Sequence, residues 1–113
     1  MRARRGILAT LLFAWGCGSS GGSGGGNVIQ FGGGLGLAYS PGVLAVHVGD
    51  TVTWEGDFST HPLVSGANCG QPDGLFQNST GSRFSFTFQQ AGTYPYYCNV
   101  HCGVGMRGQI HVQ

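Results

Sequence analysis

The chain has 113 residues, of which 23 are glycine, four are cysteine and only 8% are charged, and its formal net charge is +1. This length accommodates one small domain. The segment 27–113 contains no lysine, and its two arginines stand against four acidic residues, so it offers no basic surface for nucleic acid or phosphate groups. We therefore expect no nucleic-acid partner, and contact with other proteins through apolar or uncharged polar surfaces.

The N-terminal segment 1–17 has the layout of an export signal. Three arginines precede an apolar run at 6–16, which is too short to span a bilayer, and Cys17 follows it. A cysteine directly after a small residue at the end of such a run resembles the processing site of bacterial lipoproteins, where Cys17 would become the acylated N-terminus. An ordinary cleaved signal and an uncleaved anchor are the alternatives. We expect an exported protein, either periplasmic or held at the extracytoplasmic side of a membrane through lipidated Cys17.

Residues 18–26 consist only of glycine and serine. Such a segment has no side chains to bury and loses much conformational entropy on ordering, so it predicts a flexible linker that spans roughly 15–18 Å on average. It would either tether the following domain to a membrane or form the start of a freely soluble protein. The remaining segment 27–113 is the predicted domain.

Apolar residues in 27–113 recur with a period of two between glycine, proline, asparagine and aspartate, and no stretch keeps helical spacing. This alternation predicts β-strands. A loop or bulge is expected at 32–34, a hairpin-like turn at Gly49–Asp50, and a long excursion on one flank at 66–82. The expected strands, in chain order, are 27–31, 35–39, 43–48, 51–55, 83–89, 93–98 and 109–112.

Seven or eight short strands in fewer than ninety residues are typical of an antiparallel Greek-key β-sandwich, which we predict as the fold class. The inward-facing side chains of the two sheets would form the core. The predicted core residues are Val46, Val52, Trp54, Phe84, Phe86, Phe88 and Ile110.

Four side chains of the types that bind copper occur with a specific spacing. His101 and Met106 follow Cys98 at three and eight positions, and His61 lies on a distant loop upstream. Two imidazoles and a thiolate in a near-trigonal plane, with a thioether as a weak axial donor, form the ligand set of mononuclear blue-copper centres. We expect one copper ion, alternating between Cu(I) and Cu(II), at His61, Cys98, His101 and Met106.

Two other metal sites use some of the same residues. A tetrahedral zinc site could combine the two histidines with Cys98 and Cys102, but it leaves Met106 unexplained and Cys69 unpaired. A dinuclear copper site could use the same two cysteines, but it needs a histidine where the chain has Met106. The two remaining histidines, His47 and His111, are expected to be outward-facing strand residues and not ligands.

The segments 94–101 and 105–108, together with 48–54 upstream of His61, resemble the plastocyanin and azurin family of cupredoxins. The resemblance covers nearly all of 27–113, and the spacing Cys-x2-His-x4-Met is similar to that of plastocyanin-type proteins. It implies the cupredoxin form of the sandwich and a mobile electron carrier outside the cytoplasm. It also implies the copper ligands His61, Cys98, His101 and Met106.

Cys102, directly after His101, resembles a feature of the plant phytocyanins. In those proteins a cysteine at this position is bridged to one on the loop beyond the first histidine, and here Cys69 lies on such a loop. The resemblance therefore implies a Cys69–Cys102 disulfide beside the metal, which would tie the two ligand-bearing loops together. An exported protein meets an oxidising compartment, in which the bridge persists.

In a cupredoxin, His101 would present one ring edge to solvent among the small or apolar residues Pro62, Gly103, Val104 and Gly105. Such a surface allows redox proteins to bind briefly and leave quickly. We expect a monomeric one-electron carrier and not an enzyme, because the other two histidines lie apart from this cluster and form no second metal site. The alternative is a copper storage or delivery protein that uses the same ligands without electron transfer.

Overall fold

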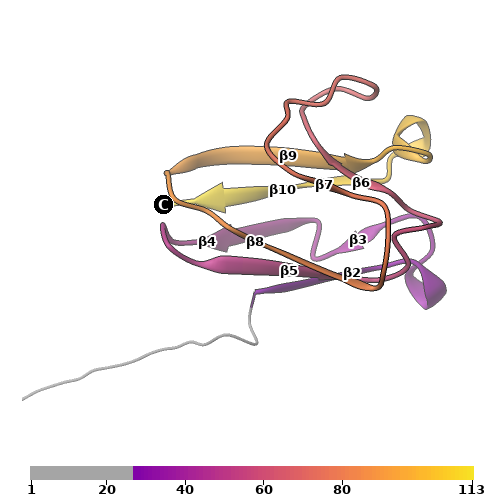
Figure 1. Cartoon of the computed structure of the whole chain (residues 1–113), viewed down its shortest axis with the longest axis horizontal. Coiled ribbons are helices and arrows are strands. Elements are labelled where there is room, and N and C mark those ends of the chain that lie inside the picture. Colours follow the sequence, from indigo (N-terminus) through magenta and orange to yellow (C-terminus); the bar gives the residue numbers. More distant parts are fainter. Residues whose placement is uncertain (1–26) are drawn as a thin grey trace, which may run out of the picture.

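Two β-sheets face each other in the computed structural model, which describes residues 27–113 (Figure 1). The predicted export segment 1–17, with Cys17, and the predicted linker 18–26 lie outside the described residues. Within 27–113, no helix is long and apolar enough to cross a membrane. The five-stranded sheet has the order β4 (Val43–Val46), β10 (Arg107–Val112), β9 (Gly92–Cys98), β6 (Leu63–Ser65) and β7 (Gln77–Asn78). The four-stranded sheet has the order β3 (Tyr39–Ser40), β2 (Val28–Phe31), β5 (Thr51–Glu55) and β8 (Arg83–Thr87).

The predicted β-sandwich is confirmed, but its sheets are mixed where antiparallel pairing was expected throughout. Strand β4 runs parallel to β10, and β2 runs parallel to β5. The other strand pairs are antiparallel. The parallel pairs join strands that are not consecutive in the chain: the chain passes from one sheet to the other between β3 and β4 and again between β4 and β5. The Greek-key connectivity remains a prediction.

The turn at Gly49–Asp50 forms, but the hairpin expected around it was wrong. Strands β4 and β5, which flank the turn, belong to different sheets. Gly49 has a φ of +94°, and its N–H donates to the carbonyl of Phe88 at 2.7 Å, while the N–H of Phe88 donates to the carbonyl of Asp50 at 3.0 Å. The turn is thus attached to the end of β8, and this attachment leads the chain from one sheet to the other.

Two short elements differ from the sequence-based expectation. The predicted strand 35–39 is instead a single 3-10 turn, η3 (Gly33–Leu35), followed by the two-residue strand β3. Strands β6 and β7 contain three and two residues, and the sequence did not indicate either of them. Strands this short show no measurable alternation of apolar and polar residues. They form because β6 pairs with the longer β9, and β7 pairs with β6.

The core contains five of the seven predicted residues as fully buried side chains. Phe84 and Phe86 are only partly buried, although they pack against the same cluster. Both lie on β8, which is the edge strand of its sheet and is therefore covered on one side only. The fully buried predicted residues are Val46, Val52, Trp54, Phe88 and Ile110.

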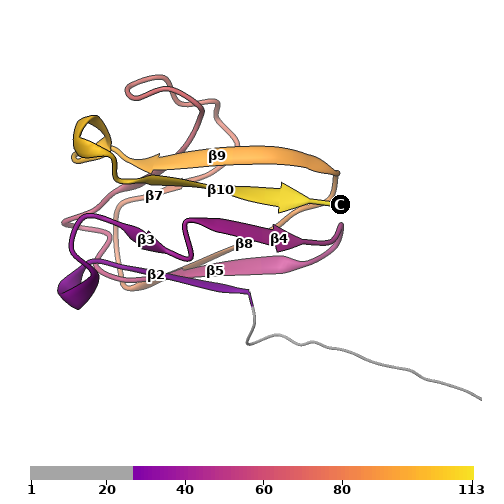
Figure 2. The ribbon, with the colours of Figure 1, turned by 180° about the vertical axis from the view of Figure 1, so that it is seen from behind.

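The loops that carry the candidate ligands gather at one end of the sandwich. Figures 1 and 2 show η3 and the second 3-10 turn, η4 (Cys102–Val104), projecting at the same end, away from the C-terminus. Segments separated by about seventy positions along the chain therefore lie at the same end of the sandwich.

Gly108 provides a stability test of the sandwich. A Cβ built at this position on β10 would lie 2.7 Å from the carbonyl oxygen of Gly42 and would overlap the hydroxyl of the buried Tyr96. We expect Gly108→Ala to lower the free energy of unfolding by about 1–3 kcal/mol, because a close-packed core cannot accommodate the extra methyl group without shifting. Denaturant titration measures this loss. Gly103→Ala is the matched control, since no described atom lies within 4 Å of its Cβ, and it should unfold like the unmodified protein.

Candidate metal centre

Strand register brings His61 next to the C-terminal ligand loop. In the pairing of β6 with β9, Leu63 lies opposite Cys98, and the N–H of Asn99 donates to the carbonyl of Pro62 at 2.8 Å. His61 immediately precedes Pro62, so it lies beside Cys98 although 37 positions separate the two residues. The sheet, and not the local sequence, determines this proximity.

The loop between β9 and β10 is closed by its own backbone. The N–H of Cys98 donates to the carbonyl of Met106 at 3.0 Å, and the N–H of Met106 donates to the carbonyl of His101 at 3.2 Å. Gly105, with a φ of +99°, has the left-handed conformation that allows the chain to turn back after η4. The three candidate ligands of this loop are therefore held together by hydrogen bonds to a paired strand end.

Three donor atoms converge at the centre of this end of the molecule. The Nδ1 atoms of His61 and His101 lie 3.1 Å apart, and the Sγ of Cys98 lies 3.8 Å and 3.5 Å from them, respectively. Cys98 is the free cysteine of the described residues and has no exposed surface. A buried thiol and two imidazoles that face one another are the arrangement expected around a shared cation.

The size of this triangle fits a metal ion. A point in its plane lies about 2.0 Å from all three corners, which is close to the bond lengths of about 2.0–2.1 Å to histidine nitrogen and about 2.3 Å to cysteine sulfur seen at zinc sites. His61, Cys98 and His101 would hold the ion through these three atoms, which form the trigonal donor set of blue-copper sites. The donor group is consistent with one copper site.

Met106, the fourth predicted ligand, is fully buried and belongs to the same core cluster as Cys98. Its backbone bonds to Cys98 and His101 place it beside the triangle. The thioether is a soft donor that suits a weak axial position on copper. Zinc sites instead use cysteine thiolate, histidine nitrogen or carboxylate oxygen.

His61 is held from several sides, and only 7% of its surface is exposed. Its ring meets the edge of Phe31 at 88° with 5.9 Å between the ring centroids, and Gly32 lies against its outer edge. Burial lowers the pKa of His61 below its ordinary value, and the neighbouring ring of His101 acts in the same direction. The neutral imidazole, which is the form that binds a metal, is therefore favoured.

A polar turn fixes the backbone just before His61. The hydroxyl of Ser59 donates to the carboxylate of Asp57 at 2.6 Å, the hydroxyl of Thr60 donates at 2.8 Å, and the N–H of Ser59 donates at 3.0 Å. These hydrogen bonds lower the pKa of Asp57 to about 2, and the bond from the Ser59 hydroxyl has the largest effect. The N–H of His61 in turn donates to the carbonyl of Asp57 at 3.0 Å, so the turn ends on the candidate ligand.

The predicted disulfide between Cys69 and Cys102 is confirmed. It joins the excursion after β6 to η4, and the buried Cys102 packs against Val64 and Tyr97. A cysteine in a disulfide has no thiolate to offer a metal. The bridge therefore removes Cys102 from both alternative sites considered above, the tetrahedral zinc site and the dinuclear copper site.

The four residues predicted to form a partner surface lie on loops at this end of the sandwich. Val104 is 71% exposed, next to the half-exposed His101. Sequence reasoning missed three further exposed apolar side chains: Leu35 and Leu37 on the η3 segment and Val100 on the ligand loop. The apolar residues in these two loops were the signal that the sequence offered for an exposed apolar surface. Only the fold shows that η3 and η4 lie at one end of the molecule (Figure 1).

The other two histidines lie away from the donors. His111 lies on β10, as predicted, whereas His47 follows the end of β4 and is not a strand residue. His47 is exposed at the end of β4 and its N–H donates to the carboxylate of Asp50, while Nδ1 of His111 lies 3.2 Å from the hydroxyl of Thr93 on the neighbouring strand. Neither joins the group of His61, Cys98 and His101.

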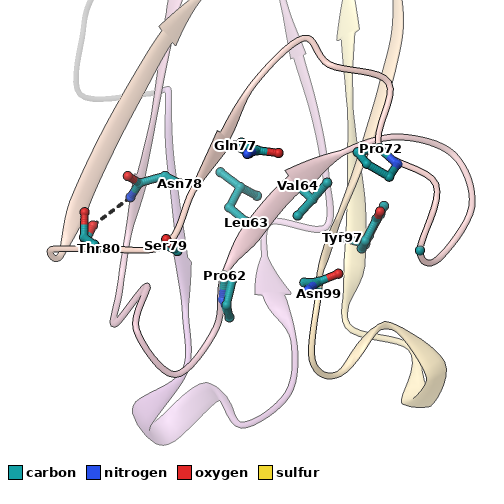
Figure 3. A pocket seen from close by; sticks show the side chains of 11 residues that line it. Pro62, Leu63, Val64, Pro72, Gln77, Asn78, Ser79, Thr80, Tyr97 and Asn99 are labelled. Atoms are coloured by element: carbon teal, nitrogen blue, oxygen red, sulfur yellow. Dashed lines mark hydrogen bonds between the residues drawn. The ribbon is translucent and has the colours of Figure 1, made fainter.

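A surface hollow of about 440 Å³ lies beside the donor cluster and does not include it. In Figure 3, Pro62 and Asn99 border one end of the hollow, Asn78 and Thr80 border one side, and Tyr97 borders the other. Its lining side chains are uncharged. A metal ion bound by the three donors would not occupy this hollow, because the donor atoms are close enough to one another to contact an ion between them.

Comparison with known proteins agrees with this geometry. The family described as copper binding proteins, plastocyanin/azurin family, matches residues 28–113. The chain is 36% identical over 88 residues to plastocyanin from Scenedesmus fuscus, which covers 68% of this chain and 88% of that protein. It is 34% identical over 94 residues to halocyanin from Natronomonas pharaonis, which covers 76% of this chain and 55% of that protein.

The structural comparison points to the same group. The purple cupredoxin from Nitrosopumilus maritimus is similar with a TM-score of 0.60 and 34% sequence identity, over 76% of this chain and 98% of that protein. The family match and the identity to plastocyanin agree with the two histidines that lie beside a free, buried cysteine. The chain belongs to the plastocyanin/azurin family of copper-binding proteins, the cupredoxins.

Proposed function

We propose that the protein is a one-electron carrier that binds a single copper ion through Nδ1 of His61, Sγ of Cys98 and Nδ1 of His101, with Met106 as a weak axial ligand. The observation that carries this proposal is the buried triangle of these three donor atoms, whose size matches metal bond lengths. Copper bound there supplies a one-electron couple between Cu(I) and Cu(II).

The surrounding chain is built to keep the donors still. His61 follows a turn fixed by Asp57, Cys98 ends a strand paired on both sides, and the ligand loop is tied to the rest of the molecule by the Cys69–Cys102 bridge. A site whose ligands move little between the two oxidation states needs little rearrangement when an electron enters or leaves. Rigidity of this kind supports a carrier of electrons more than a donor of copper ions.

Electrons would enter and leave through His101, which is the half-exposed ligand. The end of the sandwich around it exposes apolar side chains of Leu35, Leu37, Val100 and Val104. An apolar surface in a domain with few charges binds partners weakly and briefly, which suits rapid turnover of redox complexes. The small residues Pro62, Gly103 and Gly105 complete this proposed contact surface.

The partners proposed are redox proteins outside the cytoplasm, met transiently by a monomer that catalyses no reaction of its own and binds no nucleic acid. The export layout of 1–17 supports this location, and lipidation of Cys17 would hold the domain near a membrane. Mass spectrometry of the mature protein tests the location and the anchor together. A mass that includes residues 1–16, or a Cys17 without lipid, would contradict the proposed attachment.

Spectroscopy and voltammetry of the copper-loaded protein test the function. We expect intense visible absorption from thiolate-to-copper charge transfer and a reversible one-electron wave at a protein-coated electrode. A copper storage or delivery protein would instead release its metal readily to a competing chelator and would show no reversible wave. A colourless protein that retains one zinc ion would refute both functions.

Met106→Gln tests the axial position. We expect the visible absorption to remain, because the trigonal donors are unchanged, and the reduction potential to fall, because an amide oxygen is a harder donor than a thioether and favours Cu(II). Voltammetry of the variant and the unmodified protein under the same conditions measures the shift. An unchanged potential would mean that Met106 is only a core residue.

A further inference from the structure

We propose that Gly32 is a positioning residue for His61: the missing side chain at residue 32 allows the backbone after β2 to lie directly against the imidazole and to limit where its Nδ1 atom can be. The inference rests on the proposed metal site, since it concerns how one of the three donors is placed.

The contact is close. A Cβ built at Gly32 would lie 3.3 Å from Cδ2 and 3.4 Å from Nε2 of His61, distances at which the neighbour must move by a few tenths of an ångström. Gly32 also has φ +76° and ψ −167°, a backbone conformation that is essentially restricted to glycine. The residue is therefore suited to this place both by its backbone conformation and by the space it leaves.

The direction of the contact matters for the metal site. In an imidazole ring, the Cδ2–Nε2 bond lies directly across the ring from Nδ1. A side chain at residue 32 would therefore push Nδ1 of His61 toward the two other donors, which already lie 3.1 Å and 3.8 Å away.

The ring has little freedom to avoid this push. Phe31 presents its ring edge to His61, and only 7% of the His61 surface is exposed. The backbone N–H of His61 is held by the carbonyl of Asp57. The position of the Gly32 backbone thus limits the separation between the His61 nitrogen and the metal.

Gly36 offers a matched control on the same loop. Its φ of +68° and ψ of −139° are similar to those of Gly32, but no described atom lies within 4 Å of its Cβ. Replacing either glycine by alanine strains the backbone to a similar degree, whereas only Gly32→Ala adds a contact with the His61 ring. The difference between the two variants isolates that contact from general destabilisation.

The experiment compares Gly32→Ala, Gly36→Ala and the unmodified protein. In the metal-free proteins, we expect the NMR signals of the His61 ring to shift in Gly32→Ala only. In titrations with Cu(II), we expect Gly32→Ala to lose about 10–100-fold in affinity relative to Gly36→Ala, as found for outer residues that orient metal ligands, and to change the visible and EPR spectra. Equal affinities and equal spectra for the two variants would overturn the proposal.

The metal-free measurement separates this inference from the proposed function. If the His61 ring shifts in Gly32→Ala but no variant binds copper, the positioning contact is real and the metal site is wrong. If Gly32→Ala does not fold, the unmodified protein still provides a test. A nuclear Overhauser effect between the Hδ2 proton of His61 and the Hα protons of Gly32 is expected there, and its absence would also overturn the proposal.

Discussion

Replacement of Cys98 by serine should abolish the visible absorption of the copper-loaded protein while leaving the sandwich folded. The absorption depends on charge transfer from a thiolate, and a serine hydroxyl does not provide one. Cys98 is fully buried, and serine has nearly the same shape, so we expect a loss of about 1–3 kcal/mol in the free energy of unfolding from the buried hydroxyl. Visible spectra of the Cu(II) form and denaturant titration of the metal-free form measure the two effects.

A variant without the Cys69–Cys102 bridge, made by replacing both of these cysteines with alanine, is the control for this experiment. It loses two cysteines and keeps Cys98. It should retain the visible absorption. If Cys98→Ser stays blue, or if the bridge-free control holds its copper with Cys98 intact and is nevertheless colourless, the thiolate assignment is wrong.

The second large effect is expected when the bridge is removed by Cys69→Ala together with Cys102→Ala. The disulfide joins residues 33 positions apart, and closing a loop of this size stabilises a protein by about 2–4 kcal/mol through the unfolded chain. Double replacement avoids the free thiol that a single substitution would leave beside the copper ligands. Thermal and denaturant unfolding of the metal-free protein measure the loss.

The bridge should also affect the ligand loop, because Cys102 directly follows His101 and begins η4. We expect faster amide hydrogen exchange throughout the destabilised variant, with a larger increase at 99–106 than at the opposite end of the sandwich, and faster loss of copper to a chelator. An equal loss of protection at both ends would show that the bridge has no specific role at the ligand loop.

The ligand set could be predicted from the sequence because three of its members lie on one short loop. The spacing of Cys98, His101 and Met106 is a local property, and the strands on both sides of the loop show clear alternation. His61 was chosen as the distant member because a blue-copper site needs a second histidine, and the family resemblance implied the same residue. The register of β6 on β9 explains how it reaches the loop. The same family resemblance predicted the Cys69–Cys102 bridge.

The sheet assignments could not be predicted in this way. Alternation in 43–48 and 51–55 indicates two strands and a turn between them, but it is the same whether the strands pair with each other or cross to opposite sheets. The hydrogen bonds of Gly49 and Asp50 to Phe88 decide this, and they depend on residues almost forty positions away. A hairpin was the wrong choice because only tertiary contacts distinguish the two outcomes.

The environment of His61 is a third case. The glycines at 32–34 indicated a loop, yet nothing in their sequence indicates that one of them touches a candidate ligand. Gly32 meets His61 because β2 pairs with β5 and ends at the same edge as the ligand loops. Phe31 and Gly32 are thus site residues that only the three-dimensional arrangement reveals.

A crystal structure of the Cu(II)-loaded protein would show which atoms hold the metal. We expect one copper ion bound by Sγ of Cys98 and the Nδ1 atoms of His61 and His101, with the Met106 sulfur at a longer distance. A structure in which Cys98 is bonded to another cysteine, and the ion is bound elsewhere, would contradict it.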